Sequence, residues 1–268
     1  MKNFLFIGFL LAMQCNSVIN GAKLRFVPLL FNLGAQKFHR CKVSSSTDYK
    51  TNRCLEEAVQ HAISYLSEGG DSDLGLPDLD PLKVNEIAIR QGNKNAPVSI
   101  ELLFRNLDVR GLSHYKLKSF KGKVSSPKDF MFTIHGNMDK LKLIGNYKMT
   151  GNILIFPVTG NGPCNITLDG VRSVITFNGE PTTRNGKEYL KIKDFKMNVE
   201  LEKAYMYFAN LLNDETLTDG MNRFLNENWN AIFTDLKPSI EDAISQMFEI
   251  YTRRIFERVQ YKNIFLLE

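Results

Sequence analysis

The stretch that decides the fold is Met221–Val259, MNRFLNENWNAIFTDLKPSIEDAISQMFEIYTRRIFERV. Its apolar residues recur every three, four or seven positions, which is the spacing of one helix face. Other aromatic and aliphatic side chains widen this stripe, so the helix has to be enclosed by the rest of the chain. The predicted helix runs from Thr218 to Val259 and would be on the order of 60 Å long. Pro238 lies inside it and predicts either a kink or two helices joined end to end.

The preceding chain is long enough to enclose such a helix. The protein has 268 residues and 43% hydrophobic content, which allows a sizeable core in one or two domains. Residues 1–22 have the charged start and short apolar run of a cleaved secretory signal, too short to span a bilayer; an uncleaved anchor is the alternative. We therefore expect a secreted, extracellular single domain over residues 23–268, without stable membrane insertion. Cleavage is expected after one of the small residues Ser17, Gly21 or Ala22.

The formal net charge is only +5 at pH 7. Clustered lysines are largely confined to one segment, where they indicate either the solvated face of a strand and its turn or a patch for an anionic partner. We favour the solvated face and expect no nucleic-acid partner. The lysines concerned are Lys116, Lys118, Lys121, Lys123 and Lys128.

Three of the four cysteines lie beyond the predicted signal. Cys41 and Cys54 flank the polar stretch KVSSSTDYKTNR and form the natural disulfide in an oxidising compartment, worth about 3 kcal/mol. Cys164 then has no partner and is either buried and inert or paired between chains. The four histidines are scattered without metal-ligand spacing, so we expect no metal and no cofactor.

The middle of the chain alternates with a period of two from Val84 to about Ala204, which predicts sequential antiparallel strands. The apolar parity flips after Arg105–Asn106 and again between Ile192 and Phe195, as a β-bulge or sharp bend would require. The longest predicted strand runs from Leu141 to Ile155. Gly145 and Gly151 lie on its inward parity and leave room for a bend or another body. The predicted turns include Gly160–Pro163, Gly179 and Asn185–Gly186.

Two shorter segments complete the expected fold. Leu55–Leu66 carries an amphipathic helix that ends at Gly69–Gly70 and plugs one end of the core. The turn-rich segment Leu74–Val84 feeds a strand, and we interpret Asp78 and Asp80 as turn residues rather than an acid–base pair. The predicted class is α+β: a strongly curved antiparallel sheet wraps the long C-terminal helix, with a short disulfide-tethered N-terminal helix. A curved sheet and a cylinder fit loosely, which leaves voids or an apolar ligand cavity.

Several segments, taken in order, resemble the insect takeout and juvenile-hormone-binding-protein family across nearly all of the mature chain. They are LGLPDLDPLKV (74–84), FRNLDVRGLSHYKL (104–117), GNYKMTGNILIFPVTGNG (145–162), ITLDGV (166–171), NLLNDETLTDGMNRFLNENW (210–229) and IFTDLKP (232–238).

The resemblance implies a secreted carrier of the bactericidal permeability-increasing-protein-like, lipid-binding class, with a hydrophobic tunnel between helix and sheet. Members of the family are not known as enzymes and are associated with juvenile hormone transport, chemosensory tissue, feeding and circadian behaviour. The family's N-terminal disulfide maps onto Cys41 and Cys54. The second disulfide of moth juvenile-hormone carriers has no counterpart here, which favours a takeout-type member and leaves juvenile hormone in doubt as the ligand.

No catalytic motif was found. The sequence contains no nucleophile elbow, phosphate loop, dinucleotide fingerprint or zinc-protease helix, and Ser113 beside His114 is expected to point to a different face. We therefore expect a monomeric carrier of an isoprenoid or fatty-acid-like ligand and not an enzyme. The alternatives are a secreted interaction or signalling factor without a dedicated ligand, whose receptor is unknown, and, least favoured, a lipid ester hydrolase.

A carrier needs apolar walls and one polar group to orient its ligand. For the polar group we select Tyr147 and Tyr251. Asn165 begins the only glycosylation sequon of the mature chain. The candidate apolar walls are Ile100, Leu102, Phe104, Phe132, Met149, Trp229, Phe233, Met247 and Phe248.

Overall fold

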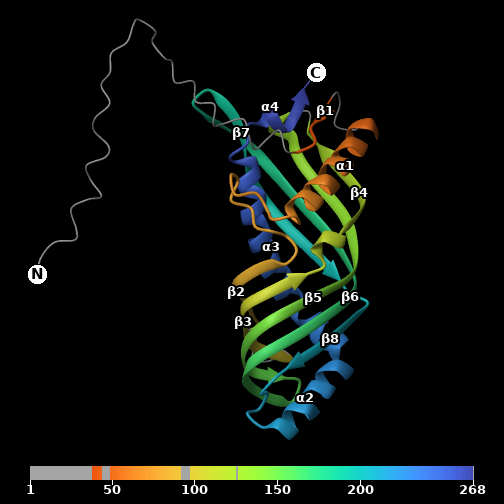
Figure 1. Ribbon diagram of the computed structural model, residues 1–268, viewed down its shortest axis with the longest axis vertical. Coiled ribbons are helices and arrows are strands. Elements are labelled where there is room, and N and C mark those ends of the chain that lie inside the picture. Colours follow the sequence, from red (N-terminus) through yellow and green to blue (C-terminus); the bar gives the residue numbers. More distant parts are fainter. Residues whose placement is uncertain (1–37, 44–48, 92–96, 125, 268) are drawn as a thin grey trace, which may run out of the picture. The chain divides into compact units, whose positions relative to one another are not determined.

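The computed structural model describes residues 38–43, 49–91, 97–124 and 126–267. The predicted signal segment lies outside these residues. Within them, a curved antiparallel sheet lies against a long C-terminal helix, and Figure 1 shows α1 near one end of that sheet and α2 near the other. The elements in chain order are β1 (Cys41–Val43), α1 (Tyr49–Leu66), β2 (Leu82–Arg90), β3 (Val98–Arg110), η3 (Leu112–His114), β4 (Lys116–Lys123), η4 (Pro127–Asp129), β5 (Phe130–Ile153), β6 (Phe156–Arg184), β7 (Lys187–Glu200), β8 (Lys203–Phe208), α2 (Glu215–Glu227), α3 (Trp229–Phe256), α4 (Tyr261–Ile264) and β9 (Phe265–Leu267).

The sheet is built around one long hairpin. Strand β5 pairs along its whole length with β6, from Phe130 opposite Gly179 to Ile153 opposite Phe156. On the outer side of β5, β4 covers the first half and β3 the second, and β2 follows β3. On the outer side of β6, β8 covers the first half and β7 the second. Five shorter strands therefore extend a single hairpin on its two sides. A small parallel pair of β1 and β9 lies apart from this sheet.

Both parity flips are confirmed as irregularities in strand pairing. The register of β3 against β5 shifts between Arg105 and Asp108, where Asn106 has a φ of 49°. The register of β6 against β7 shifts between Thr176 and Asn178, opposite Asp194 with a φ of 48°. An extra residue on one strand bends it and increases the local twist, which produces the curvature seen in Figure 1.

The inward glycines let backbones approach closely, as expected. A Cβ at Gly145 would lie 2.9 Å from the Asn106 carbonyl oxygen and from the Leu107 Cα. A Cβ at Gly151, which has a φ of 137°, would lie 2.1 Å from the Ser99 carbonyl oxygen. Because such contacts are far inside van der Waals distance, the curved part of the sheet requires glycine on β5.

Two predicted turns were wrong. Gly160–Pro163 and Gly179 lie inside β6, whereas the chain reverses between Ile153 and Phe156, so that Ile155 is 84% exposed instead of facing inward. Gly160 serves a close approach rather than a turn, because a Cβ there would lie 2.7 Å from the Asn210 carbonyl oxygen. The turn at Asn185–Gly186 is confirmed.

The predicted C-terminal rod is two helices, but the break is not at the proline. Asn228 separates α2 from α3 with a φ of −104° and a ψ of 16°, and its side chain donates to the Phe224 carbonyl oxygen at 2.9 Å. Helix α3 continues through Pro238. Pro238 and Thr234, four residues earlier, are both exposed. Proline has no N–H to donate to the Thr234 carbonyl. Because both residues are exposed, water can bond this carbonyl instead.

Side chains of the helices satisfy the outer edges of the sheet. On β4, the Leu117 N–H donates to Gln60 Oε1 and the Phe120 N–H to Glu56 Oε1, both at 3.1 Å. The β7 edge is bonded in the same way by Ser245 and Glu241 of α3, and the β8 edge by Asn222 and Asn226 of α2. Each of these edges is therefore held by a different helix.

Two large apolar cores lie along α3. One packs Ile232 and Leu236, near the start of α3, against the inner faces of β2, β3 and the second half of β5. The other packs Phe256, at the end of α3, against the first half of β5, the second half of β6, and β7. The second core also contains Leu55 of α1, which positions α1 over that part of the sheet.

Candidate functional site

An apolar cavity of about 330 Å³ lies between α1, the C-terminal half of α3 and the inner face of the sheet. The apolar stripe of α1 forms one wall, and Ala58 and Ala62, one turn apart, leave space where larger side chains would fill the core. Phenylalanines and methionines of β5, β6 and β7 form the opposite wall. The lining includes Leu55, Ala58, Val59, Ala62, Ile63 and Leu66 of α1; Phe132, Ile134 and Met138 of β5; Ile175 and Phe177 of β6; Phe195 and Met197 of β7; and Phe248, Tyr251, Thr252, Ile255 and Phe256 of α3.

No lysine, arginine, aspartate or glutamate is among the described residues that line this cavity. Of its hydroxyl groups, that of Tyr115 is within 3.0 Å of Ser173 Oγ, and that of Thr252 donates to the Phe248 carbonyl oxygen at 2.9 Å. The Tyr251 hydroxyl makes no hydrogen bond within the described ranges. Burial raises the pKa of Tyr251, so this hydroxyl stays protonated at neutral pH and can donate to a ligand.

Tyr251 also lines a second hollow, a groove of about 560 Å³ between β2 and α3. That groove is more polar, with Lys83, Glu86 and Asp242 among its lining residues. Because Tyr251 lines both spaces, its side chain lies between the apolar cavity and the polar groove. The arrangement places a donor at the boundary between an apolar and a polar environment.

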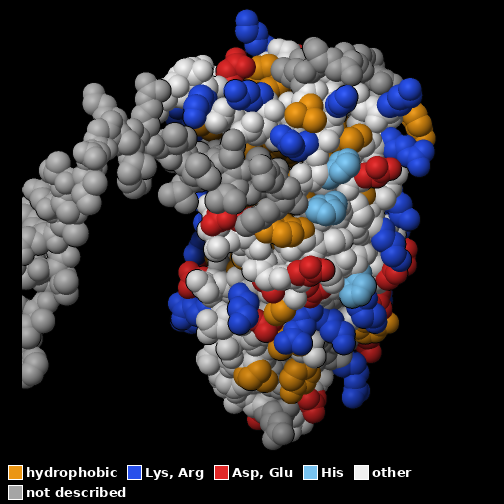
Figure 2. Space-filling view, turned by 45° about the horizontal axis from the view of Figure 1, so that its top comes forward, with side chains coloured by type: hydrophobic (Ala, Val, Ile, Leu, Met, Phe, Trp, Pro, Cys, Tyr) orange, Lys and Arg blue, Asp and Glu red, His pale blue; other side chains and the backbone are white. Residues whose placement is uncertain are grey.

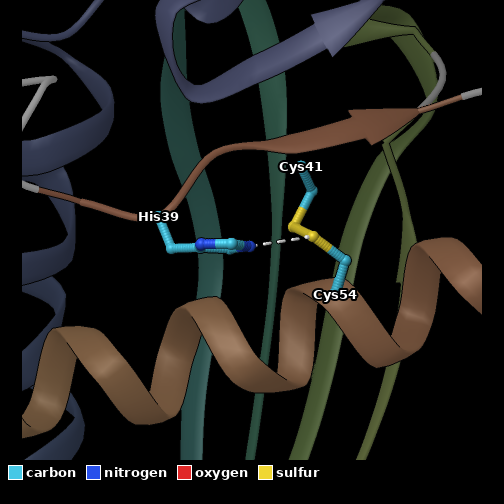
Figure 3. A group of neighbouring side chains, drawn as sticks. All are labelled: His39, Cys41 and Cys54. Carbon is cyan, nitrogen blue, oxygen red and sulfur yellow. Dashed lines mark hydrogen bonds between the residues drawn. A yellow bond between two sulfur atoms is a disulfide. The ribbon is translucent and has the colours of Figure 1, made fainter.

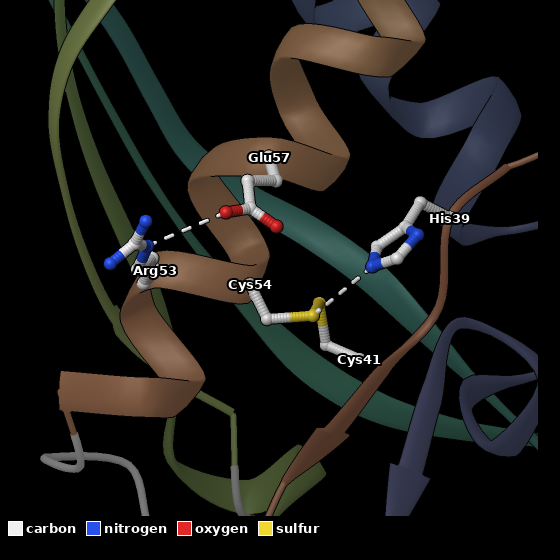
Figure 4. The surroundings of a disulfide bond; sticks show 5 residues. All are labelled: His39, Cys41, Arg53, Cys54 and Glu57. Atoms are coloured by element: carbon white, nitrogen blue, oxygen red, sulfur yellow. Dashed lines mark hydrogen bonds and ion pairs between the residues drawn. A yellow bond between two sulfur atoms is a disulfide. The ribbon is translucent and has the colours of Figure 1, made fainter.

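His39 and the predicted disulfide lie at the α1 side of the cavity. Cys41 and Cys54 are bonded, as expected, with a Cα–Cα distance of 5.8 Å. His39 is exposed and lines the cavity, and its ring faces the disulfide with Nε2 3.4 Å from Cys54 Sγ (Figure 3). Arg53 and Glu57 pair on the same helix beside Cys54 (Figure 4). His39, Cys41 and Cys54 have metal-ligand spacing, but the disulfide consumes both thiols.

The structure brings three of the eleven sequence-selected ligand residues to the apolar cavity: Phe132, Phe248 and Tyr251. Met247 lines the polar groove. Phe233 packs on the core around the cavity without lining it. The remaining aliphatic and aromatic residues of β3 and β5 belong to the other core, around the start of α3: Ile100, Leu102, Phe104, Tyr147 and Met149.

Tyr147 and Trp229 have other contacts. The Tyr147 hydroxyl donates to the Ala209 carbonyl oxygen at 2.7 Å, and burial raises its pKa to about 12. Trp229 is half-buried at the start of α3, with the Lys203 ammonium 5.5 Å from its ring centre. The sequence interpretation missed the contribution of α1, because its apolar stripe was assigned to a plug. The alanines at positions 58 and 62 were the signal available in the sequence.

Ser113 and His114 come closer than expected. Ser113 Oγ lies 3.3 Å from His114 Nδ1, because both residues belong to the short helix η3. The Ser113 hydroxyl, however, donates to Asp80, which also accepts the backbone N–H groups of Gly111 and Ser113 at 3.1 Å. Burial raises the pKa of Asp80, but these hydrogen bonds outweigh it and leave the pKa lowered. The group therefore ties the segment before β2 to the turn after β3.

Cys164 agrees with the interpretation favoured from the sequence, and the clustered lysines lie on β4 and on η4 after it. Cys164 is buried as a free thiol, and burial raises its pKa to about 11. The five clustered lysines are all exposed, and Lys116 and Lys123 pair with Asp139 and Asp129. Figure 2 shows acidic and basic side chains interspersed over the face in view. None of the described helices is long and apolar enough to cross a membrane.

A curved antiparallel sheet around a long helix, with an uncharged apolar cavity between them, defines a hydrophobic-ligand-binding type of architecture. The model of the haemolymph juvenile hormone binding protein family matches residues 25–266, and the chain belongs to that family. The family resemblance seen in the sequence is thereby confirmed. The family's name describes binding and not catalysis.

Known relatives and a solved structure agree with this assignment. The circadian clock-controlled protein daywake of Drosophila melanogaster is 24% identical over 200 residues, covering 71% of this chain and 77% of daywake. Daywake of Drosophila yakuba is 24% identical over 233 residues, covering 85% and 87%. The crystal structure of Takeout 1 from Epiphyas postvittana matches with a TM-score of 0.68 at 20% identity, covering 84% of this chain and 98% of Takeout 1. This likeness confirms the predicted fold.

Proposed function

We propose that the chain is a secreted carrier that holds one small, uncharged hydrophobic ligand in the cavity beneath α1. The apolar cavity of about 330 Å³ carries this proposal, since its volume lies within the range of small-molecule sites. Membership of a family named for juvenile hormone binding supports it. An isoprenoid ester of that type and a fatty-acid ester both have the required chemistry.

The energetics of the cavity are sufficient for a carrier. Transfer of about 15 carbons from water into an apolar site contributes roughly 12 kcal/mol at about 0.8 kcal/mol per methylene. Association and ordering costs of about 4 kcal/mol leave about 8 kcal/mol, which corresponds to micromolar affinity. The ligand's polar end is expected to accept a hydrogen bond from Tyr251.

The same lining predicts a preference for esters over acids. A carboxylate in this cavity would lose its hydration, and no lysine or arginine is among the described lining residues to compensate its charge. We therefore expect a methyl ester to bind at least about tenfold more tightly than the free acid of the same chain at pH 8, a difference of about 1.4 kcal/mol. Lowering the pH toward 5 should narrow the gap, because the neutral acid becomes more populated.

A cavity-filling variant tests the proposal. Ala62→Phe places a ring in the cavity and should weaken binding of N-phenyl-1-naphthylamine by at least about tenfold. His61→Phe is the matched control, since His61 is exposed on the same helix, and should bind as the wild type does. Equal probe affinity in both variants and the wild type, with intact folding by circular dichroism, would rule out this cavity as the ligand site.

Secretion is tested separately by expressing the full chain in insect cells. We expect the protein in the medium, with an intact mass that corresponds to cleavage after Ser17, Gly21 or Ala22. Retention in the cells with an uncleaved N-terminus would contradict the secreted part of the proposal and leave the ligand site unaffected.

A further inference from the structure

The sequon Asn165–Ile166–Thr167 lies on β6, and its two outer residues point to the outer face of the sheet. These residues belong to β6 where it is flanked by β5 on one side and by β8 on the other. Ile166 is 8% exposed and faces the core, whereas Asn165 is exposed and points outward. Successive strand residues alternate between faces, so Asn165 and Thr167 share the outer face. Within the described ranges the Asn165 side chain makes no hydrogen bond.

Large hydrophobic side chains surround Asn165 on this outer face. Ile144 of β5 and Tyr207 of β8 are its direct cross-strand partners, and Tyr205 is the partner of Thr167. Ile144 is 41% exposed, and Tyr205 and Tyr207 are each 50% exposed. Directly opposite residues have Cβ atoms about 5 Å apart and diagonal ones about 7–8 Å apart. All three side chains therefore lie within the reach of one sugar residue attached to Asn165.

We propose that Asn165 carries an N-linked glycan whose first sugar packs on Tyr207 and covers the patch formed by Ile144, Tyr205 and Tyr207. In the reaction, the Asn165 amide nitrogen loses one proton and bonds to the anomeric carbon of an oligosaccharide. The bond between that carbon and a phosphate oxygen of the polyprenyl diphosphate donor breaks, and polyprenyl diphosphate leaves. The donor is the lipid-linked oligosaccharide of the secretory pathway, so the modification requires entry into that pathway.

Two observations favour a glycan as the cover of this patch. The sequon lies inside the patch, so the covalent link holds the sugar there at high effective concentration. The patch is also mixed in character, because Lys142 is the other cross-strand partner of Thr167 and Lys203 lies 5.7 Å from the Tyr205 ring centre. Sugars have an apolar face for aromatic rings and hydroxyl groups for such polar neighbours. The proposal does not depend on the carrier function.

Occupancy is tested on the full chain secreted from insect cells. Treatment with peptide N-glycosidase F should lower the mass of the wild type by one glycan and convert Asn165 to aspartate. Thr167→Ala removes the sequon and should abolish the mass shift, whereas Thr167→Ser keeps a sequon and should retain it. An unmodified wild-type chain, or a glycan that survives in Thr167→Ala, would overturn the proposal.

The packing on Tyr207 is tested by the rate at which the enzyme releases the glycan from native protein, divided by the rate from denatured protein. The wild-type ratio should be well below one, because the first sugar is covered by the ring. Tyr207→Ala should raise the ratio at least about threefold. Tyr189→Ala, on β7, is the matched control and should leave it unchanged. Equal ratios in the wild type and Tyr207→Ala would overturn the packing.

Discussion

Replacing Tyr251 by phenylalanine removes the hydroxyl at the boundary between the apolar cavity and the polar groove and conserves the ring. The other lining hydroxyls, of Tyr115 and Thr252, already have partners within the protein. Burial keeps the Tyr251 hydroxyl protonated by raising its pKa. Tyr251→Phe therefore removes the donor that we assign to the polar end of a ligand and leaves the apolar walls in place.

The expected magnitude follows from one hydrogen bond. A neutral hydrogen bond contributes about 1 kcal/mol net, which is about fivefold in affinity. Tyr251→Phe should therefore bind methyl tetradecanoate about fivefold more weakly than the wild type does. Pentadecane, which has the same number of carbons and no acceptor, should bind equally to both proteins. The measured quantity is the ratio of the two dissociation constants, from displacement of a fluorescent probe.

Tyr115→Phe is the matched control for this experiment. Its hydroxyl also lines the cavity, but it is engaged with the buried Ser173. Its loss should lower the free energy of unfolding by about 1–2 kcal/mol, because Ser173 loses its partner, and should leave the ester-to-alkane ratio unchanged. If Tyr251→Phe weakened both ligands equally, or if Tyr115→Phe shifted the ratio as much, the assignment of Tyr251 would be refuted.

Further outcomes concern the first core and the free thiol. Asn222→Ala should lower the free energy of unfolding in urea by about 3 kcal/mol, because the 6% exposed Asn222 side chain bonds both the N–H and the C=O of Phe208. Asn226→Ala should lower it by less, because Asn226 is half-buried. A larger loss in Asn226→Ala than in Asn222→Ala would contradict this account. Cys164 is buried, and its pKa of about 11 leaves about one part in a thousand as thiolate at pH 8. Maleimide should therefore label native protein slowly, and rapid labelling would count against the burial of the thiol. Because the folded pKa is raised above the usual 9.0, this group's contribution to stability is present below pH 9 and is lost as the pH rises through about 11, a loss that Cys164→Ala should not show.

Period and parity predicted most of the fold. The switch from a helical to an alternating period separated α3 from the sheet. The parity flips at Asn106 and Asp194 located the register shifts of β3 against β5 and of β6 against β7, whereas the shift of β4 against β5 between Leu117 and Ser119 was not predicted. These features are local, because inward and outward positions on a strand follow directly from its sequence. The disulfide was predicted equally well, since only one pair of cysteines closes a short loop.

Local signals failed where distant contacts decide the structure. The glycine run at Gly160–Pro163 resembles a turn, but Gly160 serves the close approach of the chain at Asn210. Pro238 resembles a break, but its exposure on α3 allows water to solvate the freed carbonyl, and the break lies at Asn228. In both cases the sequence correctly indicated a residue with an unusual backbone role. Which role the glycine or the proline has depends on the surrounding structure.

The location of the cavity could not be predicted for a related reason. All inward residues of the sheet have the same apolar character, so periodicity does not distinguish a packed core from an open space. Whether a space stays open depends on the total volume of the side chains that face it from α1, α3 and the sheet. Ala58 and Ala62 on α1 leave room opposite Phe132 of β5, whereas Phe104 of β3 lies in the packed core near the start of α3.

Helix α1 has two roles that are coupled. It covers the cavity, and through Gln60 and Glu56 it also bonds the backbone at the outer edge of β4. A movement of α1 large enough to admit a ligand must release these hydrogen bonds and expose the N–H groups of Leu117 and Phe120. We expect a bound ligand to keep α1 in place, so that the β4 edge stays covered and does not pair with a strand of another chain. Loading with ligand should therefore protect this protein against aggregation as well as against unfolding.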